Sequence, residues 1–335
     1  MACDLPDHPA WSALLAARER LLGDAADLHL VADGGTWTCS DHVPATAEQV
    51  LTAQIASAVP SPALPPSPPG ARRSILAWTV GTLPQFVHPD DRPCEPGLLT
   101  LARVYAPVLL GAAMARRRGG VFVVAHVTQT LDGRIACLNG QSQWIGNEAD
   151  RRHAHRMRAL CDAVVIGAGT ALADNPQLTV RHVRGRHPRR VVISGSGRVL
   201  RSPTHLRLFD EPGCDVLLAA GHVAVAPAPA VNLVGVQAGE AGMAPKAILR
   251  ELADRGVHSI YLEGGANTLS SFLAAGCVDL LQVHVAPLVL GSGLPCVRLA
   301  PVDHVDDGIG FRMDHAALDG DLLLSCWPKQ RPLHR

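Results

Sequence analysis

The sequence predicts an α/β layered fold over residues 121–327, with helices on both faces of a sheet. Short apolar runs that suit buried strands alternate there with helical patterns, which is typical of such layered sheets. Two of these runs end in paired glycines, at Gly167-Ala-Gly169 and at Gly264-Gly265. Open α/β sheets bind ligands at the carboxyl ends of their strands, so the two glycine turns predict a binding site along that edge.

The regular pattern begins with the apolar run 121–127, which predicts a strand, followed by a turn at Asp132-Gly133. A helix is expected over Glu148–Leu160. Asn147 is a suitable N-cap for it, and Asp150 places a negative charge in its first turn, where the helix dipole favours one.

This helix carries a basic face, because Arg151, His155 and Arg158 fall at helical spacing. Basic groups in such a row are usually solvated. Beside a loop that holds Ser142 and Trp144 they can instead converge on an anion, since an arginine fork binds phosphate through two hydrogen bonds. Both interpretations remain open from the sequence.

The next stretch combines a strand, a glycine turn and charged residues. The run Ala163–Ile166 is short enough for a buried strand and ends in Gly167-Ala-Gly-Thr170. Glycines let the backbone approach a neighbour closely, although an ordinary tight turn explains a lone Gly-x-Gly equally well. Asp174, Pro176 and Arg181 then supply a carboxylate, a rigid turn and a cation.

The remaining pattern completes the sheet. Strands are expected at 189–194, 215–220, 231–237, 257–262, 278–290 and 321–327, and helices at 244–255 and 266–275. The last helix follows Gly264-Gly265, and backbone N–H groups at such a helix start can hold a phosphate. Neither glycine turn has the Rossmann spacing of Gly-x-Gly-x-x-Gly.

Residues 1–118 predict an N-terminal α+β extension of a different texture. Helices are expected at 11–22, 45–59 and 99–117, the last interrupted near Pro107, with strands at 27–33 and 74–80 and a proline-rich linker or loop at about 60–72. This part shows no motif that carries chemistry.

The composition excludes several classes of function. The 335 residues carry no net charge and are 47% hydrophobic, which indicates a globular protein without the basic face of a nucleic-acid binder. The longest apolar stretch, 104–115, is too short to cross a membrane, and the first residues lack the pattern of a secretory signal, so a cytoplasmic protein is expected. Nine single cysteines without a Cys-x-x-Cys pair indicate neither a disulfide framework nor a zinc site, and no metal is expected.

Five stretches together resemble the reductase domain of riboflavin biosynthesis. They occur in order at Thr130–Ala136, Gln141–Ile145, Val165–Arg181, Glu263–Gly265 and Ala286–Gly291. The resemblance implies a reductase domain over 119–330 with a dihydrofolate-reductase-like fold: three layers, α/β/α, around a mixed, mostly parallel sheet. It also implies a homodimer that uses NADPH, in preference to NADH, to reduce the ribosyl group of an aminopyrimidine ribonucleotide 5′-phosphate to a ribitylamino product.

The resemblance also assigns the site. Glu263 and Asp174 would be catalytic; Glu263 would either handle a proton or orient the ribose hydroxyls, and Arg158 and Arg181 would hold the 5′-phosphate. The substrate residues would be Ser142, Arg158, Leu178, Arg181 and Glu263. The cofactor residues would be Gln129, Trp144, Gly167, Gly169, Thr170, Asp174, Ser194, Gly264 and Gly265.

Three departures from the family pattern keep alternatives open. His126 and Gln129 stand on a strand where the family usually has lysine and small residues, and Ser194-Gly195, with Arg198 nearby, replaces a usual Asp-Ser. Residues 1–118 lack the His-Ala-Glu and Pro-Cys-x-x-Cys motifs of a fused zinc deaminase. One alternative is a reductase of another pyrimidine- or pterin-like substrate, and a second is a non-catalytic nucleotide-binding or scaffold protein.

Overall fold

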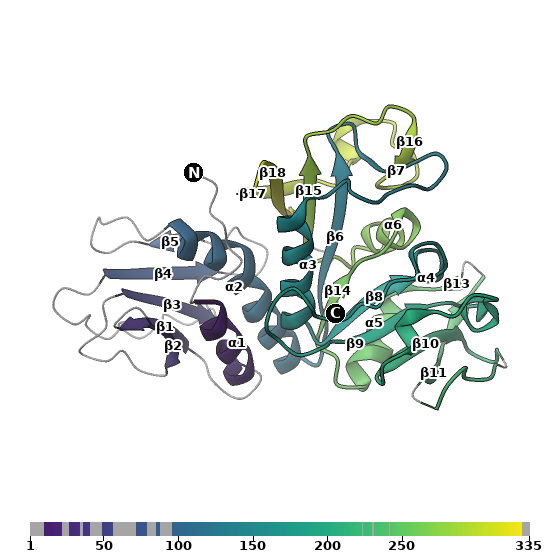
Figure 1. Cartoon of the computed structure of the whole chain (residues 1–335), viewed down its shortest axis with the longest axis horizontal. Coiled ribbons are helices and arrows are strands. Elements are labelled where there is room, and N and C mark those ends of the chain that lie inside the picture. The colour runs from purple at the N-terminus through teal and green to yellow at the C-terminus, as the bar shows by residue number, and fades with distance from the viewer. Residues whose placement is uncertain are drawn as a thin grey trace.

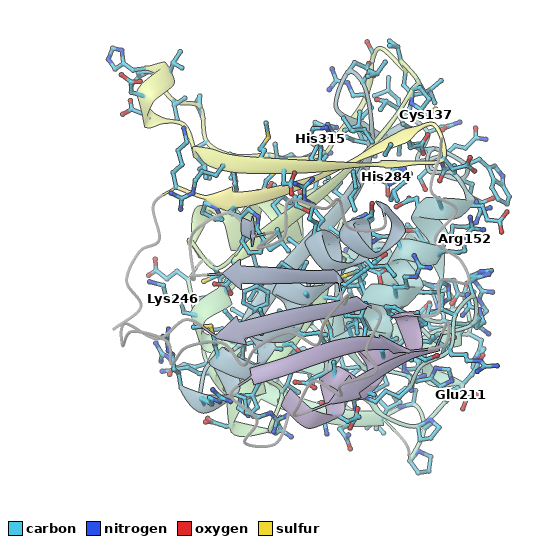
Figure 2. All side chains as sticks on the ribbon, turned by 90° about the vertical axis from the view of Figure 1, so that its left-hand side faces the viewer. Cys137, Arg152, Glu211, Lys246, His284 and His315 are labelled. Carbon is cyan, nitrogen blue, oxygen red and sulfur yellow. The ribbon has the colours of Figure 1, made fainter. Side chains whose placement is uncertain are left out.

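The structure is a computed structural model that describes residues 10–21, 27–33, 36–40, 49–55, 72–78, 85–87, 96–222, 224–229, 231–240 and 242–329. Within these residues the chain forms two main sheets, with helices between them and on the far side of the larger one (Figure 1). Figure 2 looks onto the N-terminal side of the molecule, where the smaller sheet faces the viewer.

The larger sheet has nine strands in the part of the chain that the structure describes. In spatial order they are β11 (Val231–Val236), β10 (Cys214–Ala219), β9 (Arg189–Ile193), β8 (Ala163–Gly167), β14 (Ser259–Leu262), β6 (Phe122–Thr130), β15 (Leu280–Ala286), β18 (Asp321–Pro328) and β17 (Phe311–Leu318). The first seven run parallel, and β18 and β17 add an antiparallel edge. The mixed, mostly parallel sheet is therefore confirmed.

Successive side chains along the strands point to opposite faces of the sheet, and both faces are buried. Val124 and Val164 belong to one hydrophobic cluster and Val123 and Val165 to another, as expected when successive side chains point to opposite faces. The first cluster continues into α3 (Glu148–Leu160) and the second into α5 (Pro245–Asp254) and α6 (Ala266–Ala274). The three-layer fold expected from the resemblance is thus confirmed.

Short elements complete this domain. They are α4 (Ala168–Asp174), the 3-10 turns η1 (Arg198–Arg201), η2 (Arg207–Phe209) and η3 (Val305–Asp307), and two small ribbons, β7 (Arg134–Cys137) with β16 (Gly293–Pro295) and β12 (Ala238–Gly239) with β13 (Gly242–Met243).

The N-terminal part is α+β, as predicted. It comprises α1 (Ala10–Leu21), β1 (Asp27–Asp33), β2 (Thr36–Ser40), β3 (Gln49–Ile55), β4 (Arg72–Trp78), β5 (Gln85–Val87) and α2 (Pro96–Arg117), with the strands in the order β2-β1-β3-β4-β5. Helix α2 contacts β3 of this sheet and also β6 and β14 of the larger one. The buried Arg18 on α1 pairs with Asp162 at 2.7 Å, so the N-terminal part shares its core and an ion pair with the domain that follows.

Two expectations for the N-terminal part are corrected. The helix expected over 45–59 is wrong, because 49–55 forms β3, which pairs with β1 and β4 along its whole length. Its β-branched Val50, Thr52 and Ile55 suit a strand. The hydrogen bonds to the neighbouring strands therefore determine the structure of this segment, despite the helical spacing of its apolar residues. Helix α2 is not interrupted at Pro107 but continues through it. The proline-rich segment at about 60–72 lies outside the described residues, except for its last residue, which begins β4.

The structure also shows a strand that the sequence analysis missed. In β17 the exposed and half-buried residues alternate on an outer strand, so its side chains lack the apolar run that marked the inner strands. Among the helices that the structure describes, none combines the length and apolarity needed to cross a membrane.

Candidate active site

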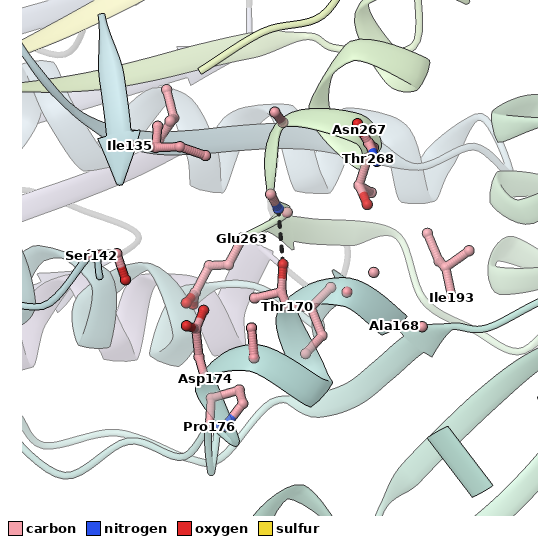
Figure 3. A pocket seen from close by; sticks show the side chains of 18 of the residues that line it. Ile135, Ser142, Ala168, Thr170, Asp174, Pro176, Ile193, Glu263, Asn267 and Thr268 are labelled. Atoms are coloured by element: carbon pink, nitrogen blue, oxygen red, sulfur yellow. Dashed lines mark hydrogen bonds between the residues drawn. The ribbon is translucent and has the colours of Figure 1, made fainter. Parts of the chain in front are cut away.

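A cleft of about 690 Å³ lies at the carboxyl ends of β6, β8, β9 and β14. Its walls include Ile166 at the end of β8, Ile193 at the end of β9 and Glu263 directly after β14. This is the edge at which the sequence predicted a site, and both glycine turns contribute to it (Figure 3).

The glycine turns fit closely against α6. A Cβ on Gly167 would collide with the hydroxyl oxygen of Thr268, and one on Gly264 would lie 2.7 Å from the Cβ of the same threonine. The Gly265 N–H donates to Thr170 Oγ1 at 3.1 Å, which joins the start of α6 to α4. The glycines therefore bring two helix starts together at the cleft, a geometry suited to a phosphate group.

Two carboxylates face the cleft from opposite sides. Asp174 comes from the last turn of α4 and Glu263 from the end of β14, and their side chains point toward the same part of the cavity (Figure 3). Desolvation by the surrounding walls raises the pKa of Asp174 above its ordinary value.

Glu263 is bound by a bidentate arginine. Nε and Nη2 of Arg158 each donate to one of its carboxylate oxygens at 2.6 Å, and both side chains are largely buried. Burial alone would lower the pKa of Arg158, but the adjacent Glu263 carboxylate raises it. Both carboxylate oxygens of Glu263 thus accept hydrogen bonds from one guanidinium, which favours an orienting role over delivery of a proton.

The loop after α4 places further basic groups near this pair. Arg158 Nη1 donates to the Thr179 carbonyl at 3.3 Å, and Arg181 Nη1 donates to Thr179 Oγ1 at 2.5 Å. The Arg181 N–H donates to Nδ1 of the buried His155 at 2.8 Å. Arg181 itself is exposed, so its guanidinium can reach an anion, whereas that of Arg158 is already engaged by Glu263.

The stability of the protein at acid pH tests the environment of His155, which holds this loop. Burial, helped by the nearby Arg158, His182 and Arg181, lowers its pKa to about 3. The unfolded chain then binds a proton there that the folded chain does not, so stability is expected to fall as the pH drops from 6.5 toward about 3.

Replacing His155 by asparagine keeps an acceptor for the Arg181 N–H but removes the titration. We therefore expect His155→Asn to lose less unfolding free energy than the wild type between about pH 6.5 and about pH 4, measured by urea denaturation. His304→Asn, which changes an exposed histidine, should retain the wild-type slope. Equal slopes for His155→Asn and the wild type would contradict the assignment.

The structure brings most of the predicted site residues to the cleft. Those that line it are Ser142, Gly167, Gly169, Thr170, Asp174, Leu178, Ser194, Glu263, Gly264 and Gly265. Trp144 lines an adjoining hollow, where its exposed ring lies 5.2 Å from the Arg151 guanidinium. Gln129, Arg158 and Arg181 do not line the cleft.

The cleft is also lined by residues that were not assigned to the site from the sequence, four of which carry side chains of interest for binding or catalysis. His126 and Thr128 lie on β6, and Arg198 and Arg298 lie on η1 and on the segment after β16. The period of two along β6 places 126 and 128 on the same face and is the signal that would have found them. Arg298 had no comparable signal, because its segment approaches the cleft only in the folded chain.

The cleft suits a phosphorylated dinucleotide better than a metal. The start of α6, the glycines beside it and the cations Arg198 and Arg298 can hold phosphates. Within the described ranges no three His, Cys, Asp or Glu side chains are grouped to hold a metal ion.

Known proteins are similar to this chain in both sequence and fold. The model of the RibD C-terminal domain family matches residues 121–312. The riboflavin biosynthesis protein RibD of Mycobacterium tuberculosis is 31% identical over 215 residues, which cover 63% of this chain and 55% of that protein. The chain thus spans little more than half of that relative.

Two further relatives match this chain over nearly all of their own length. The 2,5-diamino-6-ribosylamino-4(3H)-pyrimidinone 5′-phosphate reductase of Methanothermobacter thermautotrophicus is 34% identical over 213 residues, covering 61% of this chain and 95% of that protein. The solved structure of Acinetobacter baumannii RibD superposes with a TM-score of 0.60 at 20% identity, covering 98% of this chain and 100% of that one. The fold likeness therefore includes the N-terminal part, and by the match of the domain that forms the cleft this chain belongs to the RibD C-terminal domain family.

Proposed function

We propose that this protein is an NADPH-dependent reductase that converts the ribosylamino group of an aminopyrimidine ribonucleotide 5′-phosphate into a ribitylamino group, a step of riboflavin biosynthesis. The observation that carries the proposal is the cleft itself, in which the two glycine turns, Asp174 and Glu263 converge, with Arg158 holding Glu263 from outside the cleft. Relatives named for this reaction or this pathway support it.

The cofactor would lie along the glycine turns. Gly264, Gly265 and the start of α6 suit its pyrophosphate, while Thr170 and Asp174 on α4 suit the nicotinamide end. NADPH supplies a hydride when bound. The protein has to hold donor and acceptor close together and exclude water, so no further nucleophile is required.

The substrate would lie on the Glu263 side of the cleft. Ser142 and Leu178 also line the cleft, and the Glu263 carboxylate can accept hydrogen bonds from the ribose hydroxyls. We assign the 5′-phosphate to the exposed Arg181, with Arg158 holding Glu263 in place instead of binding the phosphate. The other expectations, a homodimer and a cytoplasmic location, stay predictions.

Selectivity for NADPH over NADH is a consequence that can be measured. Arg198 lines the cleft beside Ser194 and is well placed for the 2′-phosphate that distinguishes the two cofactors. We expect Arg198→Ala to weaken NADPH binding about 10- to 100-fold, the range of a lost charged hydrogen bond. NADH binding should stay within about threefold, both measured by calorimetry.

Arg201 offers a matched control, because it lies on the same 3-10 turn without lining the cleft. Arg201→Ala should leave both affinities unchanged. An equal loss of NADPH and NADH affinity in Arg198→Ala would mean that this arginine does not read the 2′-phosphate.

The function is tested by following NADPH oxidation in the presence of a ribosylaminopyrimidine 5′-phosphate. We expect NADPH consumption matched by a product two hydrogens heavier, and much weaker turnover of the same compound without its phosphate. Binding of NADPH with no consumption of any ribosylaminopyrimidine phosphate would refute the proposed reaction.

A further inference from the structure

A chain of buried titratable groups leads away from the floor of the cleft. His126 lines the cleft from β6 and is 8% exposed. Its Nε2 lies 3.4 Å from Asp150 Oδ1 on α3, and the same oxygen lies 3.2 Å from His284 Nδ1 on β15. His284 Nε2 in turn lies 2.6 Å from Asp321 Oδ2 at the start of β18 (His284 is labelled in Figure 2).

The sheet order builds this chain from four distant segments. β6 pairs with β15 and β15 with β18, so His126, His284 and Asp321 lie on neighbouring strands, and Asp150 of α3 lies near both histidines. Thr128 Oγ1 donates to Asp150 Oδ2 at 2.7 Å and fixes the carboxylate between the two histidines.

Asp150 is an ionised partner for both rings. Burial would raise its pKa, but the contacts with His126, His284 and Thr128 lower it well below the ordinary value. His284 is fully buried, and each of its two ring nitrogens lies near a carboxylate, Nδ1 near Asp150 and Nε2 near Asp321. The chain therefore alternates carboxylates and imidazoles from the cleft to Asp321, beside the exposed turn between β17 and β18.

The proposed reaction requires such a group. Reduction of the ribosylamino carbon C1′ breaks its bond to the ring oxygen O4′, and the nitrogen lone pair forms a C=N bond in its place. O4′ leaves as a hydroxyl and must receive one proton, while C1′ accepts the hydride and NADPH is oxidised to NADP⁺. Glu263 is poorly placed to supply that proton, because both of its carboxylate oxygens accept hydrogen bonds from Arg158.

We propose that His126 is the general acid that protonates O4′ during opening of the ribose ring, and that Asp150 and His284 are positioning residues, Asp150 holding the His126 imidazolium and His284 holding Asp150. This inference rests on the proposed function. The imidazolium gives its proton to O4′ and becomes neutral. His126 then takes up a proton from solvent before the next turnover, so one proton is consumed per turnover.

Other groups around His126 do not take this role. His153 packs on its ring at 5.4 Å but bonds with Tyr105 and Gln282, and burial lowers its pKa well below the ordinary value. The ring centroid of Tyr261 on β14 lies 5.7 Å from that of His126, and burial raises the pKa of Tyr261 far above the ordinary value. Asp150 is the carboxylate in contact with the ring in the described part of the chain.

The first test is His126→Gln, whose amide can still contact Asp150 but cannot donate a proton as an acid. We expect kcat to fall at least about 100-fold, the usual contribution of a general acid, with KM within about threefold. His153→Gln is the matched control, since it changes a buried neighbouring histidine that does not line the cleft, and it should keep kcat within about threefold. A His126→Gln enzyme with nearly normal kcat would overturn the proposal.

The second test separates acid catalysis from packing. The wild-type kcat should decline as the pH rises and the acid loses its proton. In Asp150→Asn this decline should move to lower pH, because the imidazolium has lost its carboxylate partner. Should kcat fall in His126→Gln without any shift of the profile in Asp150→Asn, the loss belongs to packing and the proposal is wrong.

Two measurements on the wild type keep the test valid should the variants fail to fold. Nitrogen-15 NMR should show both ring nitrogens of His126 protonated in the free enzyme at the pH of full activity, and a neutral ring there would overturn the proposal. A wild type that consumes no NADPH with this substrate class contradicts the proposed function, whereas an active wild type with a neutral His126 contradicts only the acid.

Discussion

Glu263→Gln is expected to remove most of the reductase activity and to destabilise the protein by about 3–5 kcal/mol, the usual cost of breaking a buried ion pair. Arg158 would remain in a largely buried position with its charge unpaired. The amide of glutamine offers a single acceptor oxygen in place of the two that now meet the guanidinium fork. Urea denaturation and kcat/KM measure the two effects.

A surface ion pair provides the comparison. Glu251 Oε1 on α5 lies 2.7 Å from Nε of Arg255, which directly follows the helix, so Glu251→Gln should change stability by no more than about 0.5 kcal/mol. Removing both partners of the buried pair, in Arg158→Met/Glu263→Gln, should recover part of the lost stability without recovering activity. A Glu263→Gln protein as stable as the wild type would show that the pair is not buried as described.

Gly167→Ala should weaken NADPH binding at least about tenfold and destabilise the fold by about 1–3 kcal/mol, as overpacking commonly does. The new methyl group would collide with the Thr268 hydroxyl and push α6 away from α4, opening the glycine cradle. Calorimetry with NADPH and thermal unfolding measure the two effects.

A second substitution, Thr268→Ala, should rescue Gly167→Ala, and Gly264→Ala provides the control. Thr268→Ala removes the hydroxyl that Gly167→Ala meets, so the double variant should regain most of the lost affinity and stability. Gly264→Ala meets the Cβ of Thr268 instead, at 2.7 Å, and the same Thr268→Ala change should not rescue it. Equal rescue of both glycine variants, or of neither, would contradict the close packing of α6 on these turns.

The sequence predicted the layered domain well because its strands and helices carry strong local patterns. The helix Glu148–Leu160 is an example: its bounds are those expected, and Asn147 accepts the Asp150 N–H at 2.9 Å as an N-cap. The helix predicted for 45–59 was wrong. The apolar residues there have helical spacing, whereas the pairing of this segment with β1 and β4 depends on residues elsewhere in the chain.

The sequence predicted the backbone turns of the candidate site, but it did not predict which side chains pair there. The glycine turns were found, because glycine at a strand end has a local meaning. The pairing of Arg158 with Glu263 joins residues that the chain separates widely, and it follows from β14 lying between β8 and β6. A sequence pattern does not show that strand order, so the sequence analysis did not predict the pairing of Arg158 with Glu263.

The most direct test of the account is the transfer of a labelled hydride. With NADPH that carries deuterium on the transferred position of C4, and a ribosylaminopyrimidine 5′-phosphate, we predict one deuterium at C1′ of the ribitylamino product by NMR. Product without deuterium at C1′, or no product with NADPH bound, would contradict reduction of the ribosyl group at this cleft.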